Sequence, residues 1–153
     1  MTPPVIIRPA QADEAQALSE LALASKAHWG YDPAFIESCR EALTVTPQDM
    51  MDFPHFVAEQ AGKVLGFYSL SFAPDSTHLD KLFVSPDAVG QGIGKRLWQH
   101  LLEQARATGV PGILIDSDPH AELFYAAMGA ERIGLTPSEA IPHRMLPLMR
   151  YTF

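Results

Sequence analysis

The feature that most constrains this chain is the order of segments within residues 76–98: strand-like, then glycine-rich, then helix-like. The first part alternates apolar and polar residues, with Leu79, Leu82 and Val84, and ends at Pro86. Three glycines, Gly90, Gly92 and Gly94, follow at every second position. Glycine lets a backbone adopt positive φ and approach a ligand closely. The unpaired N–H groups at the start of a helix attract anions. This order of segments therefore predicts an anion site that suits a phosphate group.

The glycine spacing separates the common phosphate-binding loops. A P-loop has four residues between its glycines and then Gly-Lys-Ser/Thr, but only three residues separate Gly90 from Gly94, and Arg96 replaces the hydroxyl residue. A dinucleotide loop needs Gly-x-Gly-x-x-Gly, and Lys95 stands in its last glycine position. A nucleoside triphosphate or dinucleotide is therefore disfavoured. A glycine turn that only caps the helix stays open as an alternative at this point.

Apolar periodicity and turn residues divide the chain into short strands and helices. The expected strands are 5–8, 56–60, 64–72, 77–84, 113–115, 130–133 and 146–151, and the expected helices are 12–27, 33–42, 92–108 and 119–128, with a further turn at 46–49. The order β-α-α-β-β-β-α-β-α-β-β predicts a mixed α/β fold. Antiparallel neighbours precede the glycine loop, and a βαβ crossover follows it. Residues 136–147 predict a loop long enough to cover a site.

Composition predicts one folded domain over residues 1–153. The chain is 47% hydrophobic and 19% charged, as is usual for globular proteins. Its net charge of −7 argues against binding to a nucleic-acid backbone, and no apolar run is long enough to span a membrane. The single cysteine, Cys39, offers no disulfide framework, so we expect a cytoplasmic protein. The histidines are scattered, so we expect no metal site.

Two segments resemble the GNAT superfamily of acyltransferases. Leu82–Pro86 followed by Val89–Lys95 is similar to that family's acetyl-CoA signature, which reads Gln/Arg-x-x-Gly-x-Gly/Ala after the fourth strand, although Val89 stands where Gln or Arg is usual. Residues 118–130 resemble the second half-site, a helix with a buried Ala, an aromatic pair ending in Tyr, and a glycine turn. The resemblance implies a GNAT-like fold, in which the fourth and fifth strands splay apart around a pantetheine arm.

The resemblance also implies that acetyl-CoA is the co-substrate, and it indicates which residues bind it. The loop N–H groups would hold the pyrophosphate, the N–H of Val84 or a neighbour would bond the thioester carbonyl, and Asp118 stands where many members have an Asn that bonds the pantetheine arm. The residues expected to contact acetyl-CoA are Leu82, Phe83, Val84, Val89, Gly90, Gln91, Gly92, Ile93, Gly94, Lys95, Asp118, Ala121 and Phe124.

Two residues are candidates for acid–base chemistry. Tyr125 occupies the position of the family's general acid, with its hydroxyl near the sulfur of coenzyme A, although by position alone it reads as a core aromatic residue. Asp80 precedes the thioester-binding stretch and suits a general base that takes the amine's proton directly or through water. A solvated strand carboxylate is an equal alternative. Side-chain alternation predicts that Asp80, Leu82 and Val84 share one face of the strand.

The acceptor side is expected at the break between the first two helices. His28, Trp29 and Tyr31 stand together there, which suits either the wall of an acceptor pocket or a hydrophobic staple. The expected function is acetyl transfer from acetyl-CoA to a primary amine of a small molecule or peptide by direct attack. The alternative is a non-catalytic acyl-CoA sensor or regulatory module on the same fold. A homodimer is compatible with the sequence.

Overall fold

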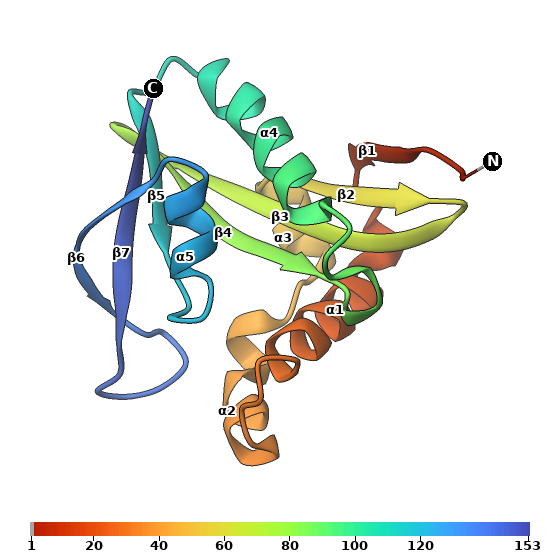
Figure 1. The fold of residues 1–153 in the computed structure, drawn as a ribbon, viewed down its shortest axis with the longest axis horizontal. Coiled ribbons are helices and arrows are strands. Elements are labelled where there is room, and N and C mark those ends of the chain that lie inside the picture. Colours follow the sequence, from red (N-terminus) through yellow and green to blue (C-terminus); the bar gives the residue numbers. More distant parts are fainter. Residues whose placement is uncertain (1) are drawn as a thin grey trace.

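The computed structural model describes residues 2–153, which form one mixed seven-stranded sheet with helices on both faces (Figure 1). The strands are β1 (Val5–Pro9), β2 (His55–Gln60), β3 (Lys63–Ala73), β4 (Ser76–Val84), β5 (Gly112–Asp116), β6 (Glu131–Pro137) and β7 (Met145–Thr152). The α-helices are α1 (Ala15–Ala27), α2 (Pro33–Leu43), α3 (Pro47–Asp52), α4 (Ile93–Arg106) and α5 (Glu122–Ala127), with short 3-10 helices η1 (Ala12–Glu14) and η2 (Pro86–Ala88).

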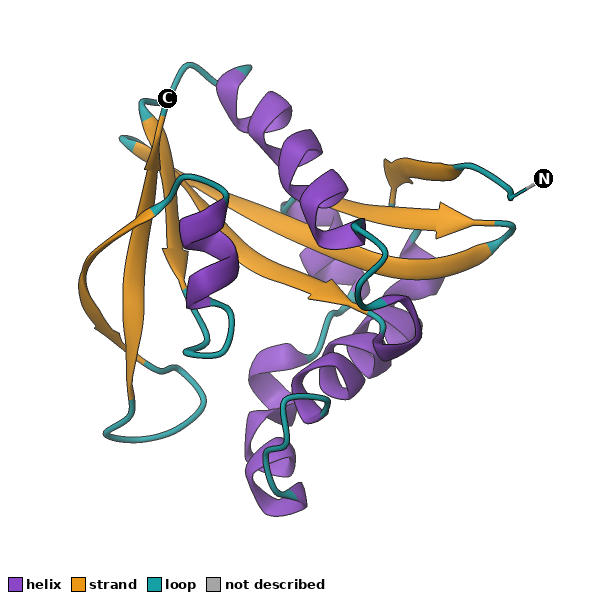
Figure 2. Cartoon of the chain, viewed as in Figure 1, coloured by secondary structure: helices purple, strands orange, loops and turns teal. Residues whose placement is uncertain are grey.

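The strand order across the sheet is β1-β2-β3-β4-β5-β7-β6 (Figure 2). β4 and β5 pair in parallel and are joined by the crossover through α4. The other neighbouring strands of residues 2–153 pair antiparallel. These pairings confirm the predicted mixed α/β fold, with its antiparallel strands before the glycine loop and its βαβ unit after it.

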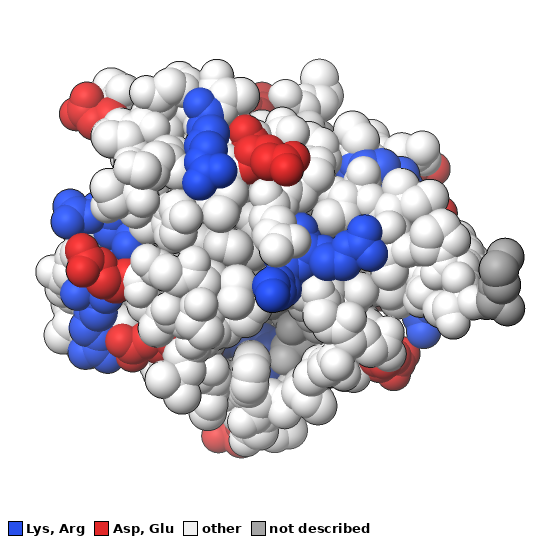
Figure 3. Space-filling view, turned by 45° about the horizontal axis from the view of Figure 1, so that its top comes forward, with Lys and Arg blue, Asp and Glu red and all other residues white. Residues whose placement is uncertain are grey.

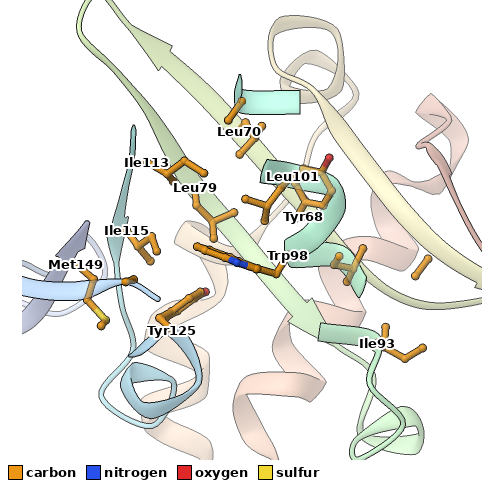
Figure 4. Packing of buried hydrophobic residues seen from close by; sticks show 14 of the residues in the cluster. Tyr68, Leu70, Leu79, Ile93, Trp98, Leu101, Ile113, Ile115, Tyr125 and Met149 are labelled. Carbon is orange, nitrogen blue, oxygen red and sulfur yellow. The ribbon is translucent and has the colours of Figure 1, made fainter. Parts of the chain in front are cut away.

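A hydrophobic cluster lies on each face of the sheet. α4 and α5 cover one face, where Trp98 packs among buried side chains that include Leu79 and Tyr125 (Figure 4). α1 and α2 cover the other face, where Leu18 and Phe67 are fully buried. Burial of each such large side chain stabilises the fold by about 1.5–3 kcal/mol relative to leaving it exposed. The sheet is therefore held from both sides.

Local sequence explains where α2 and α3 begin. Asp32 accepts a hydrogen bond of 2.8 Å from the Phe35 N–H, and Pro33 takes the first helical position, where no N–H is needed. Thr46 and Asp49 form a reciprocal capping box at the start of α3. Both starts agree with the sequence-based expectation, and α3 runs further than the single turn expected.

Some boundaries differ from the prediction for local reasons. The helix predicted over 119–128 is confined to α5, because the Asp118 carboxylate accepts the His120 N–H at 2.8 Å and holds a turn ahead of the helix. The predicted helix over 12–27 opens with the 3-10 turn η1. β6 extends to Pro137, so the loop after it is shorter than predicted.

The face predicted for Asp80 is wrong, because β4 carries a bulge at this residue. Leu70 of β3 pairs with Leu79, and its neighbour Ser69 pairs with Lys81, so Asp80 is an extra residue without a partner. A bulge turns the side chains on one side of it relative to those on the other. Strict alternation therefore fails across this position.

The neighbours of the bulge show which way Asp80 turns. Leu82 and Val84 pack with the cluster under α4 and α5. Asp80 instead accepts a hydrogen bond of 3.1 Å from Ser71 Oγ. Ser71 follows Leu70, which belongs to the α4–α5 cluster, so Ser71 lies on the face that α1 and α2 cover. Asp80 is therefore separated from Leu82 and Val84 by the plane of the sheet.

β4 and β5 separate part-way along their length. Their pairing covers Thr77–Ile113, His78–Leu114 and Leu79–Ile115 and ends there, although β4 continues to Val84. Figure 1 shows the two strands leaving their common end and diverging, with α5 beside β5 and the glycine loop beyond the tip of β4. This splay agrees with the one implied by the family resemblance.

No helix within residues 2–153 is long and apolar enough to cross a membrane. In the same residues, no three His, Cys, Asp or Glu side chains gather in an arrangement suited to a metal ion.

Gly66 on β3 lets α4 approach the sheet closely. A Cβ placed there would lie 2.7 Å from the Phe83 carbonyl oxygen and 3.1 Å from the Leu97 side chain. We expect Gly66→Ala to lower the free energy of unfolding by about 1–3 kcal/mol, because a backbone oxygen cannot move aside as a flexible side chain can. Urea denaturation measures this change.

Gly134→Ala is the matched control, since a Cβ at Gly134 on β6 meets nothing within 4 Å. Its free energy of unfolding should stay within about 0.5 kcal/mol of the wild type. Equal effects of the two substitutions would show that the close approach of the β4 backbone and α4 to Gly66 does not exclude a Cβ there.

Candidate functional site

A cavity of about 460 Å³ lies where β4 and β5 separate. The open edge of β4, the glycine loop, the start of α4 and one side of α5 line it. Of the residues predicted to bind acetyl-CoA or the acceptor or to act in catalysis, only Gln91 and Tyr31 are outside this lining. The Gln91 side chain turns back to donate to the Asp87 carbonyl at 3.3 Å. The structure thus brings nearly all predicted site residues around one space.

The glycine loop presents backbone N–H groups that no protein atom accepts. Gly90 and Gly92 have φ of 84° and 79°, a region that favours glycine. The Gln91 N–H donates to the Ala88 carbonyl and the Arg96 N–H to the Gly92 carbonyl. Among residues 2–153, no acceptor meets the N–H groups of Gly90, Gly92, Ile93, Gly94 or Lys95. The loop is thus a concave set of free donors at the positive end of α4.

Glycine also allows close packing at the first turn of α4. A Cβ on Gly94 would lie 3.3 Å from the Phe124 ring. The two half-sites recognised in the sequence therefore contact each other, α4 through Gly94 and α5 through Phe124. Lys95 lines the cavity beside them, whereas the Arg96 guanidinium donates to the Val5 carbonyl at 3.0 Å.

The open edge of β4 offers further donors to the cavity. The N–H of Ser85, the residue after β4, donates to the carbonyl of Leu65 on β3 at 2.8 Å. Backbone N–H groups alternate between the two sides of a strand, so those of Leu82 and Val84 point away from β3. β5 has already separated from β4 at this level. These two N–H groups therefore face the cavity.

Tyr125 has a buried ring and a hydroxyl that meets only the cavity. The residue is 6% exposed, and its ring packs against Phe124. It also packs against Trp98, which lies beside it in Figure 4. No side chain or backbone group of residues 2–153 hydrogen-bonds the hydroxyl, and the residue lines the cavity. Burial raises the pKa of Tyr125, and the negative charge of Asp118 raises it further. Tyr125 therefore stays protonated at neutral pH and offers one proton to the cavity.

The Asp80 carboxylate stands at the bulge, on the far side of the cavity from the loop. Water reaches it through the cavity, yet many protein atoms surround it, and this desolvation raises its pKa. The hydrogen bond from Ser71 and the charge of Lys81 act in the opposite direction. A carboxylate with a raised pKa is a better proton acceptor than an ordinary aspartate.

Asp118 takes part in a cluster of polar contacts that sequence reasoning missed. Its carboxylate accepts from Lys26 Nζ at 2.9 Å and from the Tyr31 hydroxyl at 3.0 Å, and Arg144 Nη2 donates to that hydroxyl at 2.8 Å. Desolvation opposes ionisation of Asp118, but the His120 N–H and Lys26 outweigh it and lower the pKa. The cluster ties α1, the α1–α2 loop, the β5–α5 loop and the β6–β7 loop together.

The aromatic residues predicted for the acceptor side hold this same junction. The Trp29 ring stacks on His120, with centroids 5.4 Å apart, and Tyr31 stacks on Phe35. His28 and Trp29 line the cavity, while Tyr31 reaches Asp118 instead. Burial raises the pKa of Tyr31, so its hydroxyl remains a donor. The helix break therefore closes one end of the cavity.

A second cavity of about 270 Å³ adjoins the first on the face covered by α2 and α3. The two share Asp80 and Asp116 in their linings. His55 and Ser69 form part of the second cavity, and neither was a candidate from the sequence. The only available signals were a serine inside one apolar strand and a histidine next to another, which are too common to mark a site.

The backbone N–H donors and the carboxylate acceptors lie at different ends of the space formed by the two adjoining cavities. Free N–H groups gather at the loop end, where a diphosphate would find hydrogen bonds and a favourable dipole. Carboxylates gather at the Asp80 end. Figure 3 shows that charged side chains of both signs are scattered over one face, around a hollow that has Lys or Arg at its upper edge and inside it. The residues present fit acetyl-CoA at one end and a cationic amine at the other.

Comparison with known proteins identifies the family. The model of the acetyltransferase (GNAT) family matches residues 21–130. The peptidyl-lysine N-acetyltransferase YiaC of Escherichia coli (strain K12) is 34% identical over 125 residues, which cover 81% of this chain and 82% of that protein. The phosphinothricin N-acetyltransferase of Alcaligenes faecalis is 40% identical over 96 residues. That match covers 56% of this chain and spans about half, 48%, of the relative.

A solved structure supports the same fold. The PaiA N-acetyltransferase from Thermoplasma acidophilum, determined in complex with coenzyme A, superposes with a TM-score of 0.79 at 17% identity. The match covers 98% of this chain and 99% of that chain. The chain therefore belongs to the GNAT family of N-acetyltransferases, whose usual co-substrate is acetyl-CoA.

Proposed function

We propose that this protein transfers an acetyl group from acetyl-CoA to a primary amine by direct attack of the amine on the thioester. The observation that carries the proposal is a set of backbone N–H groups without an acceptor among residues 2–153, at one end of a cavity that passes Tyr125 and reaches Asp80. They belong to Gly90, Gly92, Ile93, Gly94 and Lys95. The pyrophosphate of acetyl-CoA accepts hydrogen bonds from that loop. The pantetheine arm lies between β4 and β5.

The backbone of β4 orients and polarises the thioester. The N–H groups of Leu82 and Val84 lie on the open edge of β4 and would donate to a thioester carbonyl between the strands. A hydrogen bond from either one strengthens as the carbonyl oxygen becomes an oxyanion. These donors are fixed by the strand, so little reorganisation is needed during the reaction.

Asp80 and Tyr125 move the two protons. The amine nitrogen forms a bond to the thioester carbon while Asp80, directly or through water, takes the proton that the nitrogen loses. The carbon–sulfur bond then breaks, and the Tyr125 hydroxyl donates its proton to the departing thiolate. The products are an N-acetylated amine and free coenzyme A.

A non-catalytic acyl-CoA sensor would use the same loop. It would have no need of a protonated hydroxyl and a carboxylate in the same cavity, so their placement favours the enzyme. The discriminating experiment measures thiol release from acetyl-CoA over a panel of amines. Binding of acetyl-CoA without thiol release for any amine would establish the sensor.

Gly92→Ala tests the loop. Its φ of 79° is strained for alanine, and a change of loop shape displaces the N–H groups. We expect the Kd of coenzyme A, measured by calorimetry, to rise at least about tenfold, which corresponds to about 1.4 kcal/mol.

Gly109→Ala is the matched control for this loop variant. Gly109 has a φ of 80° and open space around it, but it lies at the other end of α4. Both variants should lose a similar stability of about 1–2 kcal/mol. An unchanged Kd for Gly92→Ala, or an equal loss of affinity in both variants, would remove the loop as the binding site.

Tyr125→Phe tests the general acid. We expect kcat to fall about 100-fold, the lower end of the usual contribution of general acid–base catalysis, while the KM for acetyl-CoA changes less than about twofold. Tyr151→Phe is the control, because Tyr151 also packs edge-on against Trp98 but does not line the cavity. A full rate in the Tyr125 variant would exclude its hydroxyl as the proton donor.

Asp80→Asn tests the general base. The base acts as a carboxylate, so kcat of the wild type should rise with pH through the raised pKa of Asp80 and level off above it. The variant should lose about 100-fold in kcat and lose this acid limb. Asp75→Asn, in the exposed β3–β4 turn, is the control. An acid limb retained in Asp80→Asn would assign the base to another group.

A further inference from the structure

The second cavity is built to receive a group other than the reacting amine. It extends from Asp80 toward the start of β2 and the first turn of α3, and the β6–β7 loop covers it from outside. Its volume of about 270 Å³ holds a short aliphatic chain with a polar head. In the proposed reaction, the reacting nitrogen of the acceptor meets the thioester beside Asp80. The rest of the acceptor then extends into the second cavity, away from acetyl-CoA.

Two buried polar side chains point into the cavity without protein partners. Ser69 is 2% exposed, and nothing in residues 2–153 hydrogen-bonds its Oγ. In those residues, Thr77 Oγ1 is the one buried side-chain polar atom that lacks both a partner and contact with solvent. Ser69 Oγ therefore meets solvent, and it does so in the cavity that the residue lines.

His55 supplies a second polar side-chain atom that faces the cavity without a protein partner. The residue is 7% exposed, and its Nδ1 lies 2.9 Å from the Phe53 carbonyl oxygen. A carbonyl only accepts, so Nδ1 carries the hydrogen and Nε2 keeps its lone pair. Burial lowers the pKa of His55, and nearby Lys81 lowers it further, which keeps the ring neutral. Nε2 is then a hydrogen-bond acceptor that lacks a donor within residues 2–153.

The charged groups around the cavity are mainly carboxylates. Asp49, Asp80, Asp116 and Glu139 face it, against the ammonium groups of Lys26 and Lys81. Lys26 already donates to Asp118, outside this cavity. One oxygen of Asp49 accepts the Thr46 N–H at 2.9 Å, which leaves the other for a ligand. Lys81 is therefore the one lysine of this lining that has no carboxylate partner among residues 2–153, and its charge would repel a bound cation.

We propose that the acceptor is a small diamine, whose second, positively charged amino group lies in this cavity. The proposal rests on the proposed function and names the class of its substrate. A carboxylate, an imidazole lone pair and a hydroxyl around one space accept hydrogen bonds from an ammonium group, which has three to donate. Burial of that charge is compensated because it is both paired and hydrogen-bonded. The acetylated amine is the one that reaches Asp80.

The test compares kcat/KM for α,ω-diaminoalkanes with that for n-alkylamines of the same chain length. We expect the diamine to be favoured at least tenfold at low salt, with the preference falling as ionic strength rises. Equal values for both, or a preference for amino acids or lysine peptides, would overturn this inference and leave the acetyltransferase intact. Absence of thiol release with every amine would instead overturn the proposed function.

Variants assign the preference to this cavity. Asp49→Asn removes the charge and keeps an oxygen for the helix cap at Thr46. Glu139→Gln removes the charge of an exposed residue in the β6–β7 loop. Each should lower the diamine-to-monoamine ratio of kcat/KM about fivefold or more. Asp52→Asn, on the exposed side of the same short helix, should leave the ratio unchanged. Unchanged ratios in both test variants would place the second amino group elsewhere.

Discussion

The separation of β4 from β5 after Leu79 is the constraint on which the rest of the site depends. A strand that continues beyond its partner leaves a row of N–H and C=O groups without sheet partners, and buried groups of this kind cost free energy unless something satisfies them. Here α4, α5 and the two N-terminal helices cover both faces of the sheet, so the open edge borders a cavity rather than bulk solvent. A ligand that carries its own amide and carbonyl groups can lie there as a strand would. The fold thus creates a site for an extended, hydrogen-bonding molecule before any side chain is considered.

The bulge at Asp80 divides the chemistry between the two faces. Without it, strict alternation would put this carboxylate on the same face as Leu82, beneath α4 and α5, where Tyr125 lies. With it, the carboxylate turns toward Ser71 and the second cavity. The Tyr125 hydroxyl and the Asp80 carboxylate therefore lie on opposite sides of the sheet, with the splay between them. In the proposed reaction, the amine would approach from the α2 side and the thiolate would leave on the α5 side.

Sequence patterns predicted the features that depend on neighbouring residues. Turn residues and apolar periodicity located the strands and helices, and the caps at Asp32 and Thr46 were visible because their partners lie within three residues. The bulge at Asp80 was not predictable, since it depends on the register with β3, which alternation along one strand does not reveal. The same holds for Asp118. Its partner Lys26 is distant in the chain, so nothing in the sequence indicated the cluster that joins four segments, and only the family resemblance implied a contact of Asp118 with pantetheine.

The charge distribution of the protein also differs between the glycine loop and the second cavity. The chain carries a net charge of −7 while its co-substrate is an anion, which looks unfavourable if charge is counted over the whole molecule. The proposed site for the anion, however, is the start of α4, where the effect of the backbone dipoles is local and independent of the side-chain count. Asp49 and Glu139 line only the second cavity, whose lining contains no residue of the glycine loop. A loop that binds phosphate through main-chain donors therefore leaves the side chains free to attract an acceptor of positive charge.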